Sequence, residues 1–483
     1  MRFPAFATTL MVALFAPATA LASLSSLDSL LLAAPNPDVV RARLLERAHA
    51  PSTRPTEAAR AFGFRAMSFA REGMADSAAI DQERAFALDD SHVRRLELAT
   101  ALIARLGPGD AARAREVLRP LQPSQPSLWT MTEVPSQALM GWAHYLAGHA
   151  DSAEFVLNPI DAWLTVKPEW RYRLACVAME RGEWIRAMDL LIPLAVATRK
   201  QDSDVMEMMN RGARSLNSTS RLDPMLSREI ALHDAIELEL LTELGARRVS
   251  FKAPDGFPLA GVLFKPANAL RPRAAVVIVA PGDTIEDCDS LAVGLRRLGL
   301  AVLFLEPRGT GRSIASTCPS PETWVGRERE MQSRVARDVR EAVATLAREA
   351  GADTSSYLLA GIGPMGSVAV EAATLDRRAR TLMLVSPSPS PVDWGSMRAS
   401  LAALGLPVYF QTAPEDVLVW DTIDAFYRAC DPRASRVADS GRQGHWAKLF
   451  RYDPRIMARF RLWLSESWPP ARRATPRPAP RRG

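Results

Sequence analysis

The chain has 483 residues, 48% of them hydrophobic and 24% charged, a composition that excludes a disordered or membrane-embedded protein. Its net charge of +6 at pH 7 is concentrated at the ends, because residues 469–483 hold five arginines and no acid, and Arg2 adds another. The body between them is close to neutral, which argues against nucleic acid as a partner, and the Arg/Pro-rich tail 469–483 is expected to be disordered.

Residues 1–22 have the pattern of a secretory signal peptide. Arg2 precedes an apolar stretch, and Ala20 and Ala22 stand before Ser23 with the A-x-A spacing of a cleavage site. A buried first helix is the alternative interpretation. No other stretch approaches the roughly 18 consecutive apolar residues of a membrane span, so we expect no transmembrane segment. The pattern predicts an exported protein, periplasmic or extracellular.

Residues 23–245 contain almost no strand pattern, and their apolar residues recur at helical spacing. Four glycines lie 34, 41 and 34 residues apart, and an alanine follows each of them five residues later. Glycine suits the left-handed turn that ends one helix, and a small alanine lets the next helix approach closely. The glycines are Gly73, Gly107, Gly148 and Gly182, and the alanines are Ala78, Ala112, Ala153 and Ala187.

This 34-residue hairpin period resembles the tetratricopeptide repeat, whose turn glycine and following alanine occupy the same positions. Ordinary helical hairpins with coincidental spacing are the alternative. The resemblance implies a concave face that binds a protein or a peptide.

From residue 246 the pattern changes to strands. Residues 246–266 form two alternating segments around Asp255-Gly256, which indicates a β-hairpin. Strand-length apolar runs then alternate with helical segments up to about residue 468, which predicts a doubly wound, mostly parallel sheet covered on both faces. The runs are 274–280, 300–306, 356–361, 380–386, 406–412 and 435–439.

Residues 246–468 resemble the α/β-hydrolase superfamily. "APGD" (280–283) stands where the family has its oxyanion loop, and "EPRGTGRS" (306–313) matches the loop after the next strand. "TAPEDVLV" and "GRQGHWAK" follow the last two strands, where the family has its catalytic acid and base. The resemblance therefore implies Asp416 as the acid and His445 as the base, in the chain order that this fold requires.

The stretch "LLAGIGPMGSVAV" (358–370) falls where the family has its G-x-S-x-G nucleophile turn. The alignment puts Gly363 at the nucleophile position, and glycine has no side chain to attack with. Pro364 follows at the oxyanion position, and proline has no N–H to donate. Without a nucleophile, Asp416 and His445 have nothing to activate. They are then either a buried structural pair or a vestigial or altered catalytic pair, and both interpretations remain open.

A displaced nucleophile would have to come from Ser367, Ser386, Ser388 or Cys288. The four cysteines share no C-x-x-C motif and no histidines cluster near them, so we expect neither a metal nor a cofactor. Export would permit a disulfide, with Cys288–Cys318 the favoured pair. The alternative is that Cys176, Cys288, Cys318 and Cys430 are all small buried apolar residues.

These patterns predict a helical-hairpin repeat array followed by an α/β-hydrolase sheet. The favoured function is that of an exported pseudoenzyme that binds or scaffolds other proteins. One alternative is an active esterase or peptidase that uses a displaced nucleophile with His445 and Asp416. Another is a fold retained only to stabilise the helical array.

Overall fold

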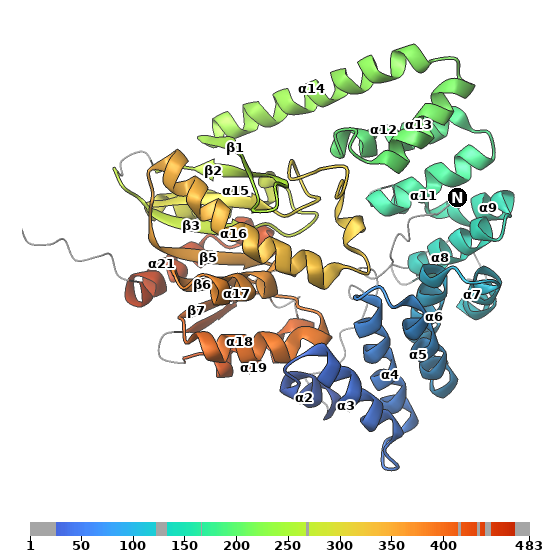
Figure 1. Cartoon of the computed structure of the whole chain (residues 1–483), viewed down its shortest axis with the longest axis horizontal. Coiled ribbons are helices and arrows are strands. Elements are labelled where there is room, and N and C mark those ends of the chain that lie inside the picture. The colour runs from blue at the N-terminus through green and yellow to red at the C-terminus, as the bar shows by residue number, and fades with distance from the viewer. Residues whose placement is uncertain are drawn as a thin grey trace, which may run out of the picture.

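The computed structural model of the chain describes residues 26–121, 133–165, 167–266, 270–413, 417–431, 435–439 and 446–468. They form a helical array followed by a sheet with helices on both faces (Figure 1). The expected signal peptide (1–22) and the expected tail (469–483) lie outside the described residues. Among the described helices, none combines the length and the hydropathy that crossing a bilayer requires.

The array is built from helices that pack against their neighbours in sequence, as in the hairpins α4–α5, α6–α7, α8–α9 and α11–α12. Its α-helices are α2 (Ser26–Ala33), α3 (Pro37–His49), α4 (Pro55–Ala70), α5 (Ala75–Leu88), α6 (His92–Arg105), α7 (Asp110–Leu118), α8 (Glu133–Leu146), α9 (Ala150–Leu157), α10 (Asp161–Leu164), α11 (Pro168–Glu180), α12 (Trp184–Ala197), α13 (Ser203–Ser215) and α14 (Thr219–Glu243).

Three of the four predicted turn glycines have the left-handed backbone that the repeat pattern requires. The φ angles are +76° at Gly73, +82° at Gly148 and +75° at Gly182. The alanines five residues later are all buried in the hairpins, as Ala78, Ala153 and Ala187. Glycine at these turns therefore has a conformational reason.

The prediction for Gly107 is wrong. In that turn the left-handed residues are Leu106 (φ +53°) and Gly109 (φ +82°). Ala112 is exposed, whereas Ala114 is fully buried. The second hairpin thus keeps the glycine-to-alanine spacing of five residues, but two residues later than the sequence alignment placed it.

We expect Gly148→Ala to lower the free energy of unfolding by about 1–2 kcal/mol, the cost of a left-handed backbone for a residue with a Cβ. No other atom lies within 4 Å of the added Cβ, so the effect is purely conformational. Gly148→Asn is the control, because asparagine tolerates this conformation better. Urea unfolding measures both, and equal losses for the two variants would contradict the assignment.

The sheet has eight strands in the order β1-β2-β4-β3-β5-β6-β7-β8. The pairs β1–β2 and β2–β4 are antiparallel and all the others are parallel, which confirms the predicted, mostly parallel sheet. The strands are β1 (Ala246–Lys252), β2 (Pro258–Phe264), β3 (Arg273–Ile278), β4 (Leu300–Glu306), β5 (Asp353–Ile362), β6 (Ala379–Val385), β7 (Val408–Thr412) and β8 (Arg436–Asp439).

Alternating strand residues supply two cores, one on each face of the sheet. Val276 and Ile278 pack with α16 and α17, whereas Val277 packs with α15 and α21 on the opposite face. The helices are α15 (Ile285–Arg297), α16 (Glu328–Ala350), α17 (Met365–Leu375), α18 (Trp394–Leu404), α19 (Val417–Ala429), α20 (Leu449–Tyr452) and α21 (Arg455–Ser467). Short 3-10 turns η3 (Pro321–Trp324), η4 (Pro391–Asp393) and η5 (Trp446–Lys448) lie in the loops.

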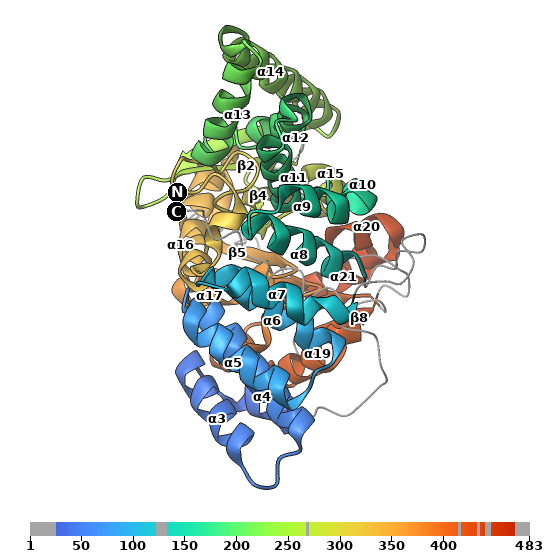
Figure 2. The ribbon, with the colours of Figure 1, turned by 90° about the vertical axis from the view of Figure 1, so that its right-hand side faces the viewer.

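The array lies across the carboxyl ends of the parallel strands, as two perpendicular views show (Figure 1, Figure 2). At one end α2 packs on α18, and at the other α14 packs on β1. Between them, the α4–α5 turn meets the loops that follow β4 and β6. Gly73 and Gly326 touch through their backbones there, since a Cβ on Gly326 would lie 2.9 Å from the Cα of Gly73.

Polar contacts complete this junction. Arg71 at the end of α4 forms an ion pair of 2.9 Å with Asp393 of η4. Glu328 begins α16 beside them, and its Oε2 is buried with no hydrogen-bond partner among the described residues. Burial raises the pKa of Glu328 to about 7, with Arg71 lowering and Asp393 raising it.

Because the pKa of Glu328 is higher in the folded protein, protonation favours folding. We expect the contribution of Glu328 to stability to be fully present below about pH 4.5, the ordinary value, and to be lost as the pH rises to about 7. Glu328→Gln should therefore match the unmodified protein at pH 4.5 and exceed it at pH 8 in urea unfolding. Glu229→Gln, at an exposed position of α14, is the control. An unchanged pH profile in Glu328→Gln would contradict this origin.

Candidate functional site

The passage from β5 to α17 has the geometry of a nucleophile turn. Gly363 stands at its apex with φ +56°, a conformation that costs energy for any residue with a Cβ. A Cβ on Gly361 would collide with the backbone oxygen of Met365, so the helix returns directly over the strand. The apex is fixed by Gly363 N donating to Val385 O (2.8 Å) and Gly363 O accepting from Ser388 N (3.1 Å).

Trp446 occupies the space above this apex. A Cβ on Gly363 would lie 2.6 Å from Cε2 and 2.7 Å from Nε1 of the indole, well inside van der Waals contact. Trp446 itself has a left-handed backbone with φ +52°. Lys448, at the end of the 3-10 turn η5 that Trp446 begins, forms an ion pair of 3.3 Å with Asp287 on the first turn of α15. The indole therefore stands where the side chain of a nucleophile would begin.

Pro364 follows the apex and caps α17 without any side-chain hydrogen bond. Its ring nitrogen has no hydrogen, so the position after the apex offers no backbone donor to an oxyanion. The hydroxyl of Ser367 donates to Pro364 O at 3.0 Å, on the first turn of the helix. Ser367 is therefore a helix residue rather than a group at the apex.

The other proposed nucleophiles differ in accessibility. Ser386 is buried, with φ +42° and its N–H donating to Gln411 O at 2.7 Å. Cys288 is completely buried in α15, and burial raises the pKa of its thiol well above the ordinary value. Ser388 is half-buried and lies directly beside the apex, because its N–H donates to Gly363 O. Ser388 is thus the one of the three best placed to replace the missing nucleophile.

All four cysteines are free and buried. The expected Cys288–Cys318 disulfide is therefore wrong, and the alternative of four small buried residues holds. Burial raises the pKa of each thiol, to about 12 for Cys176 and Cys430, so none is a reactive thiolate at neutral pH.

Asp416 and His445 lie outside the described residues. β7 and β8 pair in parallel with each other, and β7 pairs in parallel with β6. The carboxyl ends of β7 and β8 therefore lie at the same edge of the sheet as the carboxyl end of β5, with β6 between β5 and β7.

In the loop "EPRGTGRS", Arg308 has a structural role. Arg308 is buried between Asp338 of α16 (Nε–Oδ2 2.7 Å) and Asp255 of the β1–β2 turn (Nη1–Oδ2 2.6 Å). Its guanidinium group holds the pKa of Asp255 below the ordinary value. The guanidinium group of Arg308 is thus paired with two carboxylates of the fold.

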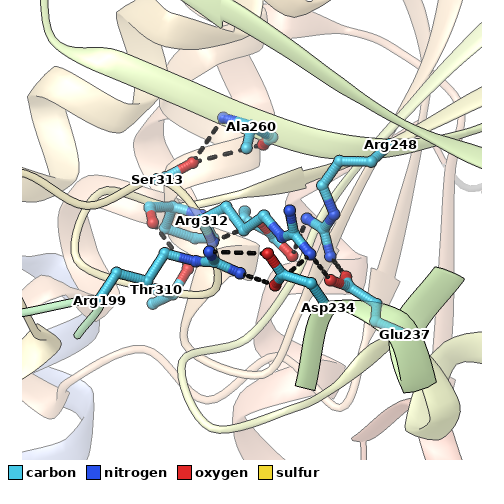
Figure 3. Close-up of polar contacts among 10 residues, drawn as sticks. Arg199, Asp234, Glu237, Arg248, Ala260, Thr310, Arg312 and Ser313 are labelled. Atoms are coloured by element: carbon cyan, nitrogen blue, oxygen red, sulfur yellow. Dashed lines mark hydrogen bonds and ion pairs between the residues drawn. The ribbon is translucent and has the colours of Figure 1, made fainter. Parts of the chain in front are cut away.

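Within the described residues, the one cluster with metal-ligand character is His233, Asp234 and Glu237 on α14. Figure 3 shows that arginines surround its two carboxylates. Arg312 reaches Asp234 (2.8 Å) and Glu237, Arg199 reaches Asp234 (3.2 Å), and Arg248 reaches Glu237. A cation would have to displace three guanidinium groups. The cluster is an ion-pair network that joins the array to the sheet.

Sequence reasoning missed Trp446. Its signal is its position in the sequence, directly after His445 in "GRQGHWAK". A bulky aromatic next to the expected base could have suggested that the apex is filled.

No family model matches the chain. It is 31% identical to the polyketide transferase claH of Penicillium crustosum over 156 residues, 30% of this chain and 48% of that protein. It is 24% identical to the thiohydrolase apmlB of Arthrinium phaeospermum over 152 residues, 31% of this chain and 45% of that protein. The chain thus spans about half the length of the curated relatives it matches.

Solved structures with a similar chain course include a Pyrococcus furiosus esterase, 13% identical, with a TM-score of 0.37 over 47% of this chain and 93% of that one. They also include the acylaminoacyl peptidase of Pyrococcus horikoshii, 14% identical, with a TM-score of 0.37 over 48% of this chain and 43% of that one.

We expect Gly363→Ala to lower the free energy of unfolding by about 2–5 kcal/mol, the sum of left-handed strain and overpacking against Trp446. In a Trp446→Ala background the same change should cost only the conformational part, about 1–2 kcal/mol. A double-mutant cycle by urea unfolding measures the difference. An identical cost in both backgrounds would show that the indole does not limit the apex.

Proposed function

We propose that this α/β-hydrolase-fold protein is a pseudoenzyme that binds or scaffolds other proteins. The observation that carries the proposal is Gly363 beneath the indole of Trp446. Nucleophilic catalysis in this fold requires a hydroxyl or thiol at the apex, within reach of a base. Here the apex has no side chain and no space for one.

Two further features support the same conclusion. Pro364 removes a backbone donor where a developing oxyanion would be stabilised, and one such donor contributes roughly 10²–10³ in rate. Ser386 and Cys288 are both buried, which removes them as simple replacements. Asp416 and His445 then form either a structural pair or a remnant of catalysis.

We assign the binding role to residues 23–245 as a tetratricopeptide-like array, followed by the hydrolase-like domain 246–468 and the tail 469–483. The left-handed glycine turns and buried alanines support the repeat, and proteins or peptides are the partner class it implies. We further propose export, with cleavage after residue 22.

An active hydrolase remains the second candidate, and one observation favours it. Ser388 lies beside the apex, hydrogen-bonded through its N–H to Gly363 O (3.1 Å). With His445 as base, its hydroxyl would replace the missing nucleophile. The curated relatives named a thiohydrolase and a polyketide transferase make an acyl thioester the substrate class to test.

The experiment measures hydrolysis of an activated ester and of an acyl thioester by the full chain, together with labelling by a serine-reactive phosphonate located by mass spectrometry. We expect neither turnover nor a labelled serine. Turnover that is lost in both His445→Ala and Ser388→Ala would overturn the pseudoenzyme proposal in favour of the second candidate.

Restoring the nucleophile tests the same point in reverse. We expect Gly363→Ser to stay inactive, and Gly363→Ser with Pro364→Met to gain little, because the new Cβ still meets the indole. Adding Trp446→Ala should give the first turnover that depends on His445, about 10²-fold or more above the single variant. If Gly363→Ser alone hydrolyses the ester as fast as an active triple variant, neither Pro364 nor Trp446 blocks the reaction.

A further inference from the structure

A pocket of about 590 Å³ lies at the junction of the array and the sheet domain, away from the apex of the nucleophile turn. One wall is the α4–α5 turn and the other is the N-terminal half of α16, where Gly73 and Gly326 bring the two parts into contact. Its lining residues are Arg71, Glu72, Gly326, Arg327, Arg329, Glu330, Ser333, Arg334 and Arg337.

The lining is strongly basic, since five arginines face only two glutamates. Glu330 is shared by Arg327 (3.0 Å) and Arg334 (2.6 Å). Glu72 is shared by Arg329, at 3.5 Å, and by Arg41 outside the pocket, at 2.8 Å. The lining thus has three more arginines than glutamates, and of these arginines Arg71 is also paired with Asp393 and Arg334 lies 3.6 Å from Asp255.

Arg337 and Arg71, on opposite walls of the pocket, differ in the partners of their guanidinium groups. Arg337 donates to Ser333 Oγ at 3.3 Å and forms no ion pair among the described residues. Arg71 comes from the opposite wall, and only 12% of its side chain is exposed. It is held in place by Asp393 (2.9 Å) and Gln332 (3.1 Å). A ligand here would meet a fixed guanidinium group on one side and an unpaired one on the other.

We propose that this pocket binds a small, multiply charged anion that carries phosphate or carboxylate groups. Guanidinium groups bind both bidentately, and the volume lies within the range of small-molecule sites. Arginines on two walls require at least two anionic groups on one molecule. A long basic stripe, as a nucleic acid would need, is not what the pocket offers.

Such a ligand would connect the two halves of the protein. Arg71 and Glu72 belong to the array, whereas the remaining lining residues belong to the loop before α16 and to α16 itself. An anion shared between Arg71 and Arg337 would compete with Asp393 for Arg71. Asp393 ends the segment that runs from Ser386 past Gly363, so binding would reach the neighbourhood of the apex. The proposal does not depend on whether the apex is catalytic.

The test uses the full chain with inorganic pyrophosphate and with citrate, each titrated calorimetrically and by thermal melting against sodium chloride of equal ionic strength. We expect saturable binding of at least one anion and a melting temperature above that in chloride. Pyrophosphate alone, citrate alone or both would identify phosphate, carboxylate or either as the recognised group.

Arg337→Gln and Arg329→Gln should each weaken binding about tenfold, the effect of losing one charge-assisted contact. Arg348→Gln is the matched control, because Arg348 is an exposed arginine on the same helix and pairs with Glu349 outside the pocket. No saturable binding of either anion would overturn the proposal. So would equal weakening by Arg348→Gln, which would indicate general charge screening.

Discussion

The indole of Trp446 lies where a side chain on residue 363 would have to start, and the chemistry of the whole domain depends on this contact. The strand, the tight return over Gly361 and the positive φ at the apex are all retained. The fold therefore still builds the turn that presents a nucleophile. A left-handed apex that carries a side chain is costly, whereas a glycine apex adopts it freely. The indole fills the space into which a side chain on residue 363 would project.

The helical array takes the place that a lid has in many enzymes. The segment after β6 is short, yet the carboxyl edge of the sheet is covered, because α4 and its turn meet the loops that follow β4 and β6. The network of Arg199, Asp234, Glu237, Arg248 and Arg312 fastens the other end of the array to the sheet (Figure 3).

The sequence was sufficient to predict the sheet, its mostly parallel pairing and the glycine apex, because apolar periodicity and glycine placement are local signals. It was insufficient where distant segments meet. Gly363 and Trp446 lie in close contact although they are 83 positions apart in the sequence. The contact of Gly73 with Gly326 joins the helical array to the sheet domain. The turn at Gly109 was missed for a local reason, since Gly107 had the same residue type at a better spacing. The spacing pattern therefore favoured Gly107, although Gly109, two residues later, has the left-handed backbone.

The four buried thiols have a consequence for how the chain keeps its shape. None of them forms a cross-link, so no covalent loop restricts the unfolded ensemble, and all of the stability comes from packing, hydrogen bonds and ion pairs. Their high pKa values keep them protonated and slow to exchange with external disulfides. The folded chain therefore contains no disulfide that a reducing agent could open.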